Sequence, residues 1–195
     1  MIKLTIQAIL QKLVWIAFCG ILYPLVFTAF AQLAFPYQAN GSLVTRNGKL
    51  VGSELMAQQF TGTKYFWPRP SAASYGTGPS GIAGSSGSNL GPTSAQLQTN
   101  VRNNAKSLRD AVKLPADAPV PADLVYASAS GLDPHISPDG ARFQVSRVAA
   151  ARGIGEDKVR ALVEKFIEPP QWGFLGEARV NVLLLNLALD SSDSK

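Results

Sequence analysis

The sequence predicts an α+β protein, with a single N-terminal transmembrane helix followed by one extracytoplasmic domain that has a small β-sheet and about five helices. Three observations support this prediction. Residues 13–35 form an apolar run that contains no charged side chain. A hairpin pattern follows the run. The rest of the 195-residue chain alternates helical apolar periodicity with turns rich in Gly and Pro.

The apolar run from Leu13 to Phe35 contains 23 residues. As a helix it would be about 35 Å long, enough to cross a hydrocarbon core of about 30 Å, so we expect it to lie in the lipid bilayer. Pro24 interrupts the run, and a local adjustment of the helix can accommodate it. A cleaved signal peptide is the alternative, because residues 29–31 (Ala-Phe-Ala) resemble a cleavage site. The run continues beyond that site, which favours a retained anchor.

Charge predicts the orientation of the chain. Lys3 and Lys12 lie in the short tail formed by residues 1–12, and short basic flanks tend to stay cytoplasmic. Residues 36–195 would then lie outside the cytoplasm. The net charge of +5 is spread without a long basic run, which does not favour a nucleic-acid partner. The single cysteine, Cys19, excludes an intramolecular disulfide.

The first elements after the run are short. Asn47-Gly48 separates two short apolar stretches and predicts a β-hairpin, and residues 53–60 suggest a short helix. Residues 64–70 (KYFWPRP) predict a rigid loop with two interpretations. Either its rings complete the core, or it is a docking surface for a partner protein. The candidate interface residues of this loop are Phe66, Trp67 and Arg69.

A Gly/Ser-rich loop is expected over residues 76–93, which contain six Gly and four Ser. Within it, backbone amides and hydroxyls could surround an anion at Ser85, Ser86, Gly87, Ser88 and Asn89. The loop lacks the Gly-Lys-Ser/Thr of a Walker A motif. A loop that is mobile or that a partner orders is therefore the preferred interpretation, and a nucleotide site is the alternative.

The C-terminal half of the chain predicts five helices. Apolar periodicity and capping patterns place them at 93–114 (with Thr93 as the first cap), 122–128, 138–152, 156 to the Pro169-Pro170 pair, and 180–189. The polar residues after Asp190 are expected to fray.

His135 is the only histidine, and Asp133 and several serines lie near it in sequence. A hydrolytic triad is an alternative to consider, but no Gly-x-Ser-x-Gly motif is present, and one histidine does not favour a zinc site. We therefore expect no catalytic residue and no metal site, and Asp133 and His135 become further interface candidates. Another alternative is a membrane-tethered nucleic-acid receptor, because residues 152–155 (Arg-Gly-Ile-Gly) resemble a helix-hairpin-helix turn.

A series of motifs resembles one family over nearly the whole chain, the C subunit of the Kdp-type potassium-transporting P-type ATPases. The motifs occur in order at residues 22–24 (LYP), 38–42 (QANGS), 51–55 (VGSEL), 66–73 (FWPRPSAA), 85–92 (SSGSNLGP), 131–138 (GLDPHISP), 147–149 (RVA) and 173–190 (GFLGEARVNVLLLNLALD).

This resemblance implies a single-pass accessory subunit of an inner-membrane complex. Its partners would be a channel-like potassium-binding subunit and a P-type catalytic subunit, with ATP and potassium handled by the complex and no cofactor bound tightly. The family is also described as a catalytic chaperone that raises the ATP affinity of the hydrolytic subunit, through a segment that corresponds here to Ser85–Asn89. The predicted topology places this segment outside the cell, away from ATP, so we expect an indirect conformational effect.

Overall fold

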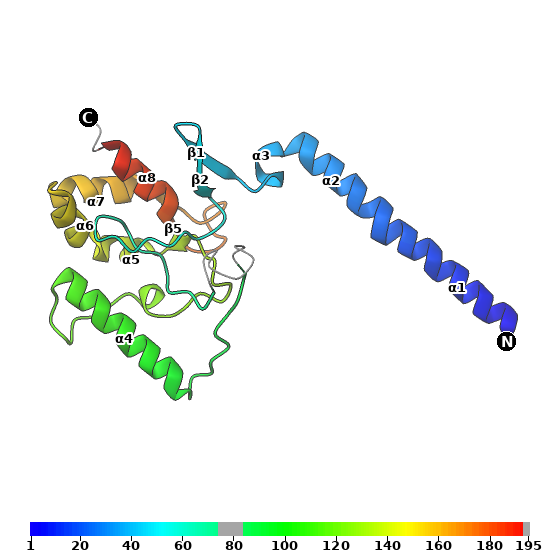
Figure 1. Ribbon diagram of the computed structural model, residues 1–195, viewed down its shortest axis with the longest axis horizontal. Helices are drawn as coiled ribbons and strands as arrows, with labels where there is room; N and C mark the ends of the chain where they lie inside the picture. Colours follow the sequence, from blue (N-terminus) through cyan, green and yellow to red (C-terminus); the bar gives the residue numbers. More distant parts are fainter. Residues whose placement is uncertain (74–83, 193–195) are drawn as a thin grey trace. The chain divides into compact units, whose positions relative to one another are not determined.

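The computed structural model describes residues 1–73 and 84–192. The chain divides into two compact units, Met1–Val51 and Gly52–Lys195. The first contains a long apolar helix and most of a two-stranded sheet, and the second contains a three-stranded sheet and five α-helices among its described residues (Figure 1). The predicted α+β class with one N-terminal apolar helix is confirmed.

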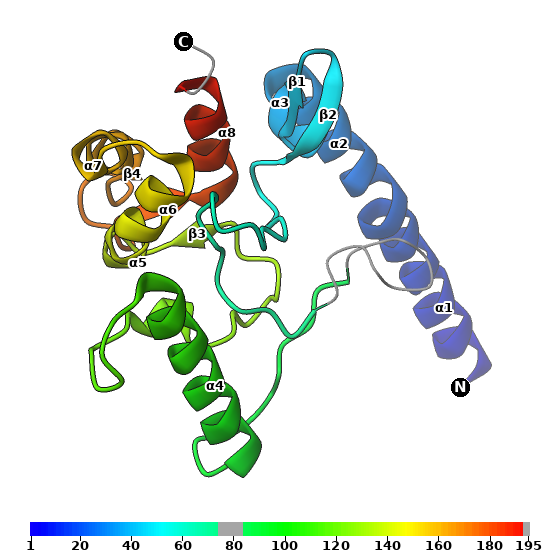
Figure 2. The same cartoon turned by 60° about the vertical axis from the view of Figure 1, so that its left-hand side comes forward.

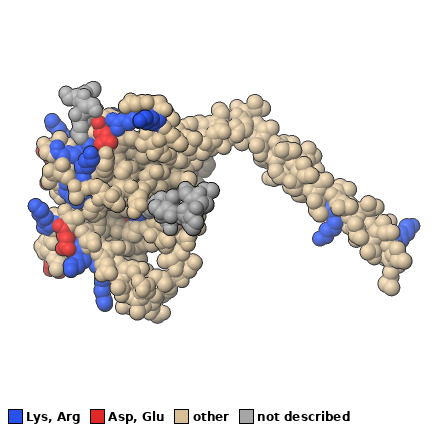
Figure 3. Space-filling model, viewed as in Figure 1, with Lys and Arg blue, Asp and Glu red and all other residues tan. Residues whose placement is uncertain are grey.

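The first unit is dominated by a continuous rod from Ile2 to Ala34. It consists of α1 (Ile2–Ala17), the π-helical segment η1 (Phe18–Leu22) and α2 (Tyr23–Ala34). Its 33 residues, with a mean hydropathy of 2.1 in the most apolar window, are long and apolar enough to cross a membrane. Charged atoms appear on the rod only near its N-terminal end (Figure 3). Residues 2–12, expected as a tail, are the first turns of this helix.

The π-helical segment explains how the rod accommodates Pro24. Proline has no N–H to donate, and its ring would crowd the carbonyl of Gly20 in a regular α-helix. In the structure the Tyr23 N–H bonds to the carbonyl of Phe18, five residues earlier. This wider turn relieves the conflict. The local adjustment expected at Pro24 is therefore present.

A short helix, α3 (Pro36–Ala39), follows the rod and leads to the hairpin of β1 (Leu43–Arg46) and β2 (Lys49–Ser53). Asn47 and Gly48 join the strands with φ values of 52° and 74°. Two positive φ values in sequence are typical of a type I′ turn, which matches the twist of a hairpin. The hairpin prediction is confirmed.

The prediction of a helix over residues 53–60 is wrong. The Ser53 hydroxyl accepts a hydrogen bond from the Leu55 N–H at 3.1 Å, and the Ala57 N–H donates to the carbonyl of Leu132 at 2.9 Å. The serine side chain and a distant carbonyl thus satisfy amides that a helix would have used. Ala57 is buried in this arrangement.

The second unit is built on a three-stranded antiparallel sheet of order β3-β5-β4. Its strands are β3 (His135–Ile136), β4 (Ile167–Glu168) and β5 (Arg179–Asn181). Val180 at the centre lies opposite both Ile136 and Ile167, and it is fully buried. The leucine-rich pattern of residues 180–189 predicts one helix. Residues 180 and 181 instead belong to β5, and the helix begins at Val182.

The second unit has five α-helices among its described residues, of which α5 and α8 contact strand β5 (Figure 2). They are α4 (Ala95–Val112), α5 (Pro138–Phe143), α6 (Val145–Arg152), α7 (Glu156–Lys165) and α8 (Val182–Ser192), and a 3-10 turn, η2 (Ala122–Leu124), precedes β3. Helix α7 contacts α5, α6 and α8, and α4 contacts α6.

Three helix boundaries differ from the prediction. Ser94, not Thr93, caps α4, because its hydroxyl accepts from the Leu97 N–H. The helix expected over 122–128 is reduced to η2. The helix expected over 138–152 divides at Gln144, whose side chain binds the backbone of Trp67.

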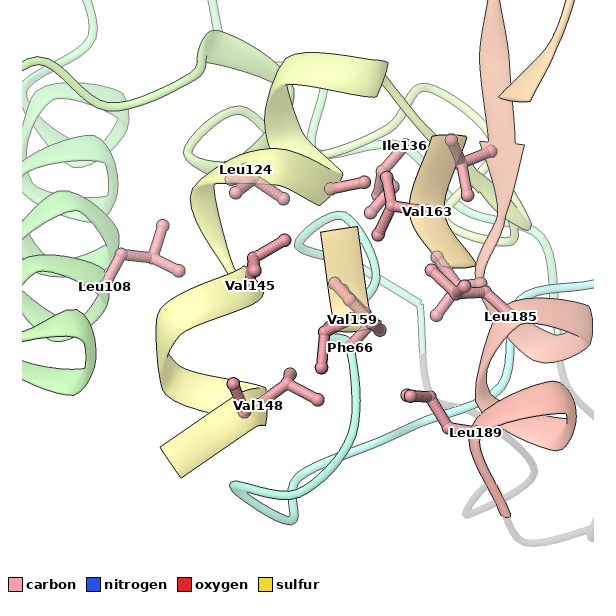
Figure 4. Close-up of a cluster of buried hydrophobic side chains, with 14 of the residues drawn as sticks. Phe66, Leu108, Leu124, Ile136, Val145, Val148, Val159, Val163, Leu185 and Leu189 are labelled. Atoms are coloured by element: carbon pink, nitrogen blue, oxygen red, sulfur yellow. The ribbon is translucent and has the colours of Figure 1, made fainter. Parts of the chain in front are cut away.

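The core of the second unit joins the loop of residues 64–70 to the helices (Figure 4). The Phe66 ring is fully buried among side chains from α6, α7 and α8, including Val148, Val159, Leu185 and Leu189. Of the two interpretations of this loop, the structure supports the core role for Phe66.

The amide side chains of Asn186 and Gln144 bind the backbone of this loop, and we call these two residues the amide clamp. The Asn186 side chain accepts from the Phe66 N–H at 2.8 Å and donates to the Phe66 carbonyl at 3.0 Å. The Gln144 side chain pairs with the Trp67 N–H and carbonyl in the same way, at 2.8 and 3.2 Å. The amide clamp therefore replaces a neighbouring strand and satisfies backbone groups that would otherwise be buried without partners.

Arg147 of α6 reinforces the clamp. Its guanidinium donates to the carbonyls of Thr63 and Tyr65 at 2.6 and 3.0 Å and to the Gln144 side-chain oxygen at 2.6 Å. It also lies 3.8 Å from the centre of the Trp67 ring, in a cation–π arrangement. Burial lowers the pKa of Arg147 to about 10, so the guanidinium stays charged at neutral pH.

Replacing Asn186 with alanine tests the clamp. The Phe66 N–H and carbonyl lose their partners inside the core, so we expect the free energy of unfolding to fall by about 2–4 kcal/mol. Urea unfolding of the full chain in detergent, followed by tryptophan fluorescence, measures the change. Asn103→Ala at an exposed position of α4 is the control, with an expected change below about 0.5 kcal/mol. Equal stability of the two variants would contradict a structural role for the clamp.

Candidate functional site

The loop of residues 64–70 meets residues 123–137 and residues 177–179 beside β3, and together they form a cleft of about 350 Å³. We call it the charged cleft. Its polar lining comes from Arg69, Asp123, Asp133, His135, Ser137, Glu177 and Arg179. The structure thus brings together three of the interface candidates, Arg69, Asp133 and His135. Phe66 lies in the core instead, and Trp67 packs on Arg147.

Asp133 connects the other two candidates in the charged cleft. One carboxylate oxygen lies 2.8 Å from Nη1 of Arg69, and both side chains are a little over one quarter exposed. The other oxygen accepts from the His135 backbone N–H at 3.0 Å and lies 3.8 Å from the ring Nδ1. The carboxylate therefore links the loop of residues 64–70 to the first residue of β3.

The turns around β3 position these side chains. Ser137 follows the strand and caps α5 by accepting from the Gly140 N–H at 2.9 Å. Asp123 accepts from both the N–H and the hydroxyl of Ser137, at 2.7 and 3.0 Å. The Ser137 hydroxyl therefore caps a helix instead of pairing with His135. This arrangement differs from the serine–histidine pair of a hydrolase.

Residues 85–89, which we call the Ser/Gly segment, pack against the turn that precedes Asp133. The Ser86 N–H and the Ser85 hydroxyl both donate to the carbonyl of Ser130, at 3.0 and 2.9 Å. A Cβ added at Gly87 would lie 2.8 Å from the carbonyl oxygen of Ala129, so only glycine fits this approach. Ser88 and Asn89 are exposed, and residues 76–83 of the expected loop lie outside the described residues.

The environment of His135 lowers its pKa below the ordinary value of 6.5. Partial burial of the ring is the main cause, and the positive charge of Arg179 adds to it, whereas Glu168 and Asp133 act in the opposite direction. Arg179 and Glu168 are paired across β5 and β4 at 3.0 Å. Sequence reasoning missed both residues, because only the strand register brings them to the histidine.

Residues 152–155, whose sequence resembles a helix-hairpin-helix turn, begin with an arginine that binds other parts of this protein. Arg152 at the end of α6 donates to the Lys64 carbonyl at 2.7 Å and pairs with Asp190 at 2.8 Å. Glu156 and Asp157 occupy the first turn of α7, where their charges oppose phosphate binding. This geometry disfavours a nucleic-acid site. Among residues 1–73 and 84–192 no group of three His, Cys, Asp or Glu is arranged to hold a metal ion.

Comparison with known proteins agrees with the resemblance drawn from the motifs. The model of the family described as "K+-transporting ATPase, c chain" matches residues 5–191. The chain belongs to the KdpC family. Curated KdpC subunits of potassium-transporting ATPases match it over nearly their full lengths. The subunit of Sorangium cellulosum is 54% identical over 95% of this chain and 96% of its own. That of Geobacter metallireducens is 51% identical over 94% and 95%. KdpC membership and the apolar rod together indicate a membrane-associated protein.

The histidine gives a pH-dependent prediction. Because the folded state disfavours its charged form, the unfolded chain binds more protons between pH 6.5 and the lower folded pKa. His135 therefore contributes full stability above pH 6.5, and that contribution falls as the pH drops through this window. NMR titration of the single histidine should give a pKa below 6.5. Arg179→Ala should raise the pKa, whereas the remote variant Arg102→Ala should leave it unchanged. A titration at or above 6.5 would contradict the described environment.

Proposed function

We propose that the chain is a non-catalytic accessory subunit of an ATP-driven potassium import complex in the bacterial cytoplasmic membrane. The apolar rod would anchor it in the bilayer and residues 36–195 would lie outside the cytoplasm. Its partners would be a channel-like potassium-binding subunit and a P-type catalytic subunit. KdpC membership supports this proposal, because the curated relatives are named as subunits of a potassium-transporting ATPase. ATP and potassium would be handled by the complex.

The observation that carries the functional proposal is the packing of the Ser/Gly segment against the turn that precedes Asp133, a residue of the charged cleft. Loops that bind phosphate present free backbone N–H groups to the ligand. Here the Ser86 N–H and the Ser85 hydroxyl are both occupied by the Ser130 carbonyl. The segment therefore stabilises the turn that precedes Asp133. This arrangement favours an indirect effect on nucleotide affinity over direct nucleotide contact.

An indirect effect requires that the domain contacts one conformation of the pump better than another. The charged cleft suits this role, because Arg69 and Asp133 are paired yet partly exposed, so a partner's charged group can join the pair in one state only. A coupling of about 1–3 kcal/mol corresponds to an affinity change of roughly 5- to 150-fold. Contacts of this kind would raise the ATP affinity of the catalytic subunit without a nucleotide site on this chain.

The close approach at Gly87 allows a matched test of this mechanism. Gly87→Ala pushes the Ser/Gly segment away from the carbonyl of Ala129, whereas a Cβ at Gly91 meets no atom within 4 Å. In the assembled pump we expect Gly87→Ala to raise the KM for ATP several-fold and Gly91→Ala to leave it unchanged. Potassium-stimulated ATP hydrolysis as a function of ATP concentration measures both.

The amount of this chain in each purified complex is the control for assembly. If Gly87→Ala assembles normally and keeps the KM of the wild-type pump, the Ser/Gly segment has no role in ATP affinity. If the wild-type chain does not assemble with a P-type catalytic subunit, the accessory function itself is wrong.

A further inference from the structure

The only histidine of the chain, His135, lines the charged cleft. Histidine is the side chain whose ordinary pKa, about 6.5, places its change of charge between about pH 5 and 8. The His135 side chain is 23% exposed, so protons from the surrounding water can reach it. The charged cleft therefore contains a group whose charge responds to pH within this range.

The backbone around His135 is held from two directions. Strand pairing places His135 opposite Asn181 of β5, and the Val182 N–H at the start of α8 donates to the carbonyl of Pro134 at 3.0 Å. On the other side, the Asp133 carboxylate accepts from the His135 N–H at 3.0 Å. Because these bonds fix the strand, a new charge on the ring acts mainly on the neighbouring side chains.

Asp133 is the side chain that a protonated His135 attracts most directly. Its Oδ1 lies 3.8 Å from the ring Nδ1, which is too long for a hydrogen bond but short enough for a strong attraction between opposite charges. A proton on Nδ1 turns this nitrogen into a donor close to the carboxylate. The Oδ2 of Asp133 already pairs with Arg69 at 2.8 Å. Protonation of His135 thus divides one negative charge between two cations.

Acids outnumber arginines around the ring. Among the described residues, the charged side chains that surround His135 come from the loop of residues 64–70, η2, the turn before β3, β4, and β5 with the turn that precedes it: Arg69, Asp123, Asp133, Glu168, Glu177 and Arg179. Burial lowers the pKa of His135 below 6.5, so the ring is neutral at neutral pH. The cleft then favours a positive group of a partner, and protonation reduces that preference by one charge.

We propose that His135 is a proton sensor: its protonation weakens the contact of the charged cleft with a cationic side chain of the pump and so lowers the affinity of the catalytic subunit for ATP. This inference rests on the proposed accessory function, in which the cleft contacts one conformation of the pump better than another. With residues 36–195 outside the cytoplasm, the sensor would respond to the pH on that side. One charge about 8 Å from a partner's cation, at an effective dielectric constant of about 40, changes affinity roughly fivefold.

ATP hydrolysis by the assembled pump, measured from about pH 7.5 to about pH 5, tests this inference. The KM for ATP of each variant is expressed relative to its own value at the highest pH. We expect this relative KM to rise roughly fivefold more in the wild-type pump than in His135→Gln, whose side chain stays uncharged. The profile of His135→Gln reports how the rest of the pump responds to pH. Arg102→Ala, at an exposed position of α4, should follow the wild-type profile.

A second variant keeps the histidine and changes only the pH at which it gains a proton. Arg179→Ala removes a positive charge that lowers the pKa of His135, so its relative KM should begin to rise at a higher pH than in the wild type. The pKa of the histidine, measured by NMR of the full chain, should move in the same direction. A histidine with a purely structural role would not connect these two measurements.

Equal pH profiles for the wild type and His135→Gln would overturn the inference, as would an Arg179→Ala profile that is not shifted. If His135→Gln does not assemble, the shift between the wild type and Arg179→Ala decides. Equal profiles together with a raised KM for ATP in Gly87→Ala would reject the proton sensor and leave the accessory function intact.

Discussion

The hydrogen bonds of the amide clamp determine how the second unit is assembled. The loop of residues 64–70 is extended and partly buried, yet its central residues pair with no strand, so their backbone groups depend on side chains. Asn186 and Gln144 supply these partners for Phe66 and Trp67. Because Asn186 belongs to α8 and Gln144 lies between α5 and α6, the clamp ties these helices to one loop.

The clamp also positions the charged cleft. Arg69 follows Trp67 by two residues, with Pro68 and Pro70 on either side restricting the backbone between them. Once Trp67 is fixed, the Arg69 guanidinium reaches Asp133 at 2.8 Å. The Ser/Gly segment bonds to the Ser130 carbonyl, in the turn that precedes Asp133 of the same cleft. Packing in the core is thereby connected to the surface through which the domain is proposed to act on the pump.

The sequence predicts those features of the fold that depend on local chemistry. The long apolar run and Asn47-Gly48 identify the rod and the hairpin, because length and turn conformation are local properties. The three-stranded sheet is not predictable in this way, since its strands have only two or three residues and carry no periodicity. For the same reason Glu168 and Arg179 could not be placed beside His135. Gln144 and Asn186 resemble ordinary helix residues until the loop that they bind is seen.

Photolabelling of the assembled complex with an azido derivative of ATP tests most directly whether this chain influences the pump without binding nucleotide. We expect the label on the hydrolytic subunit and none on this chain. Peptide mapping that finds the label within residues 85–89 would contradict the claim, because it would place nucleotide in direct contact with the Ser/Gly segment.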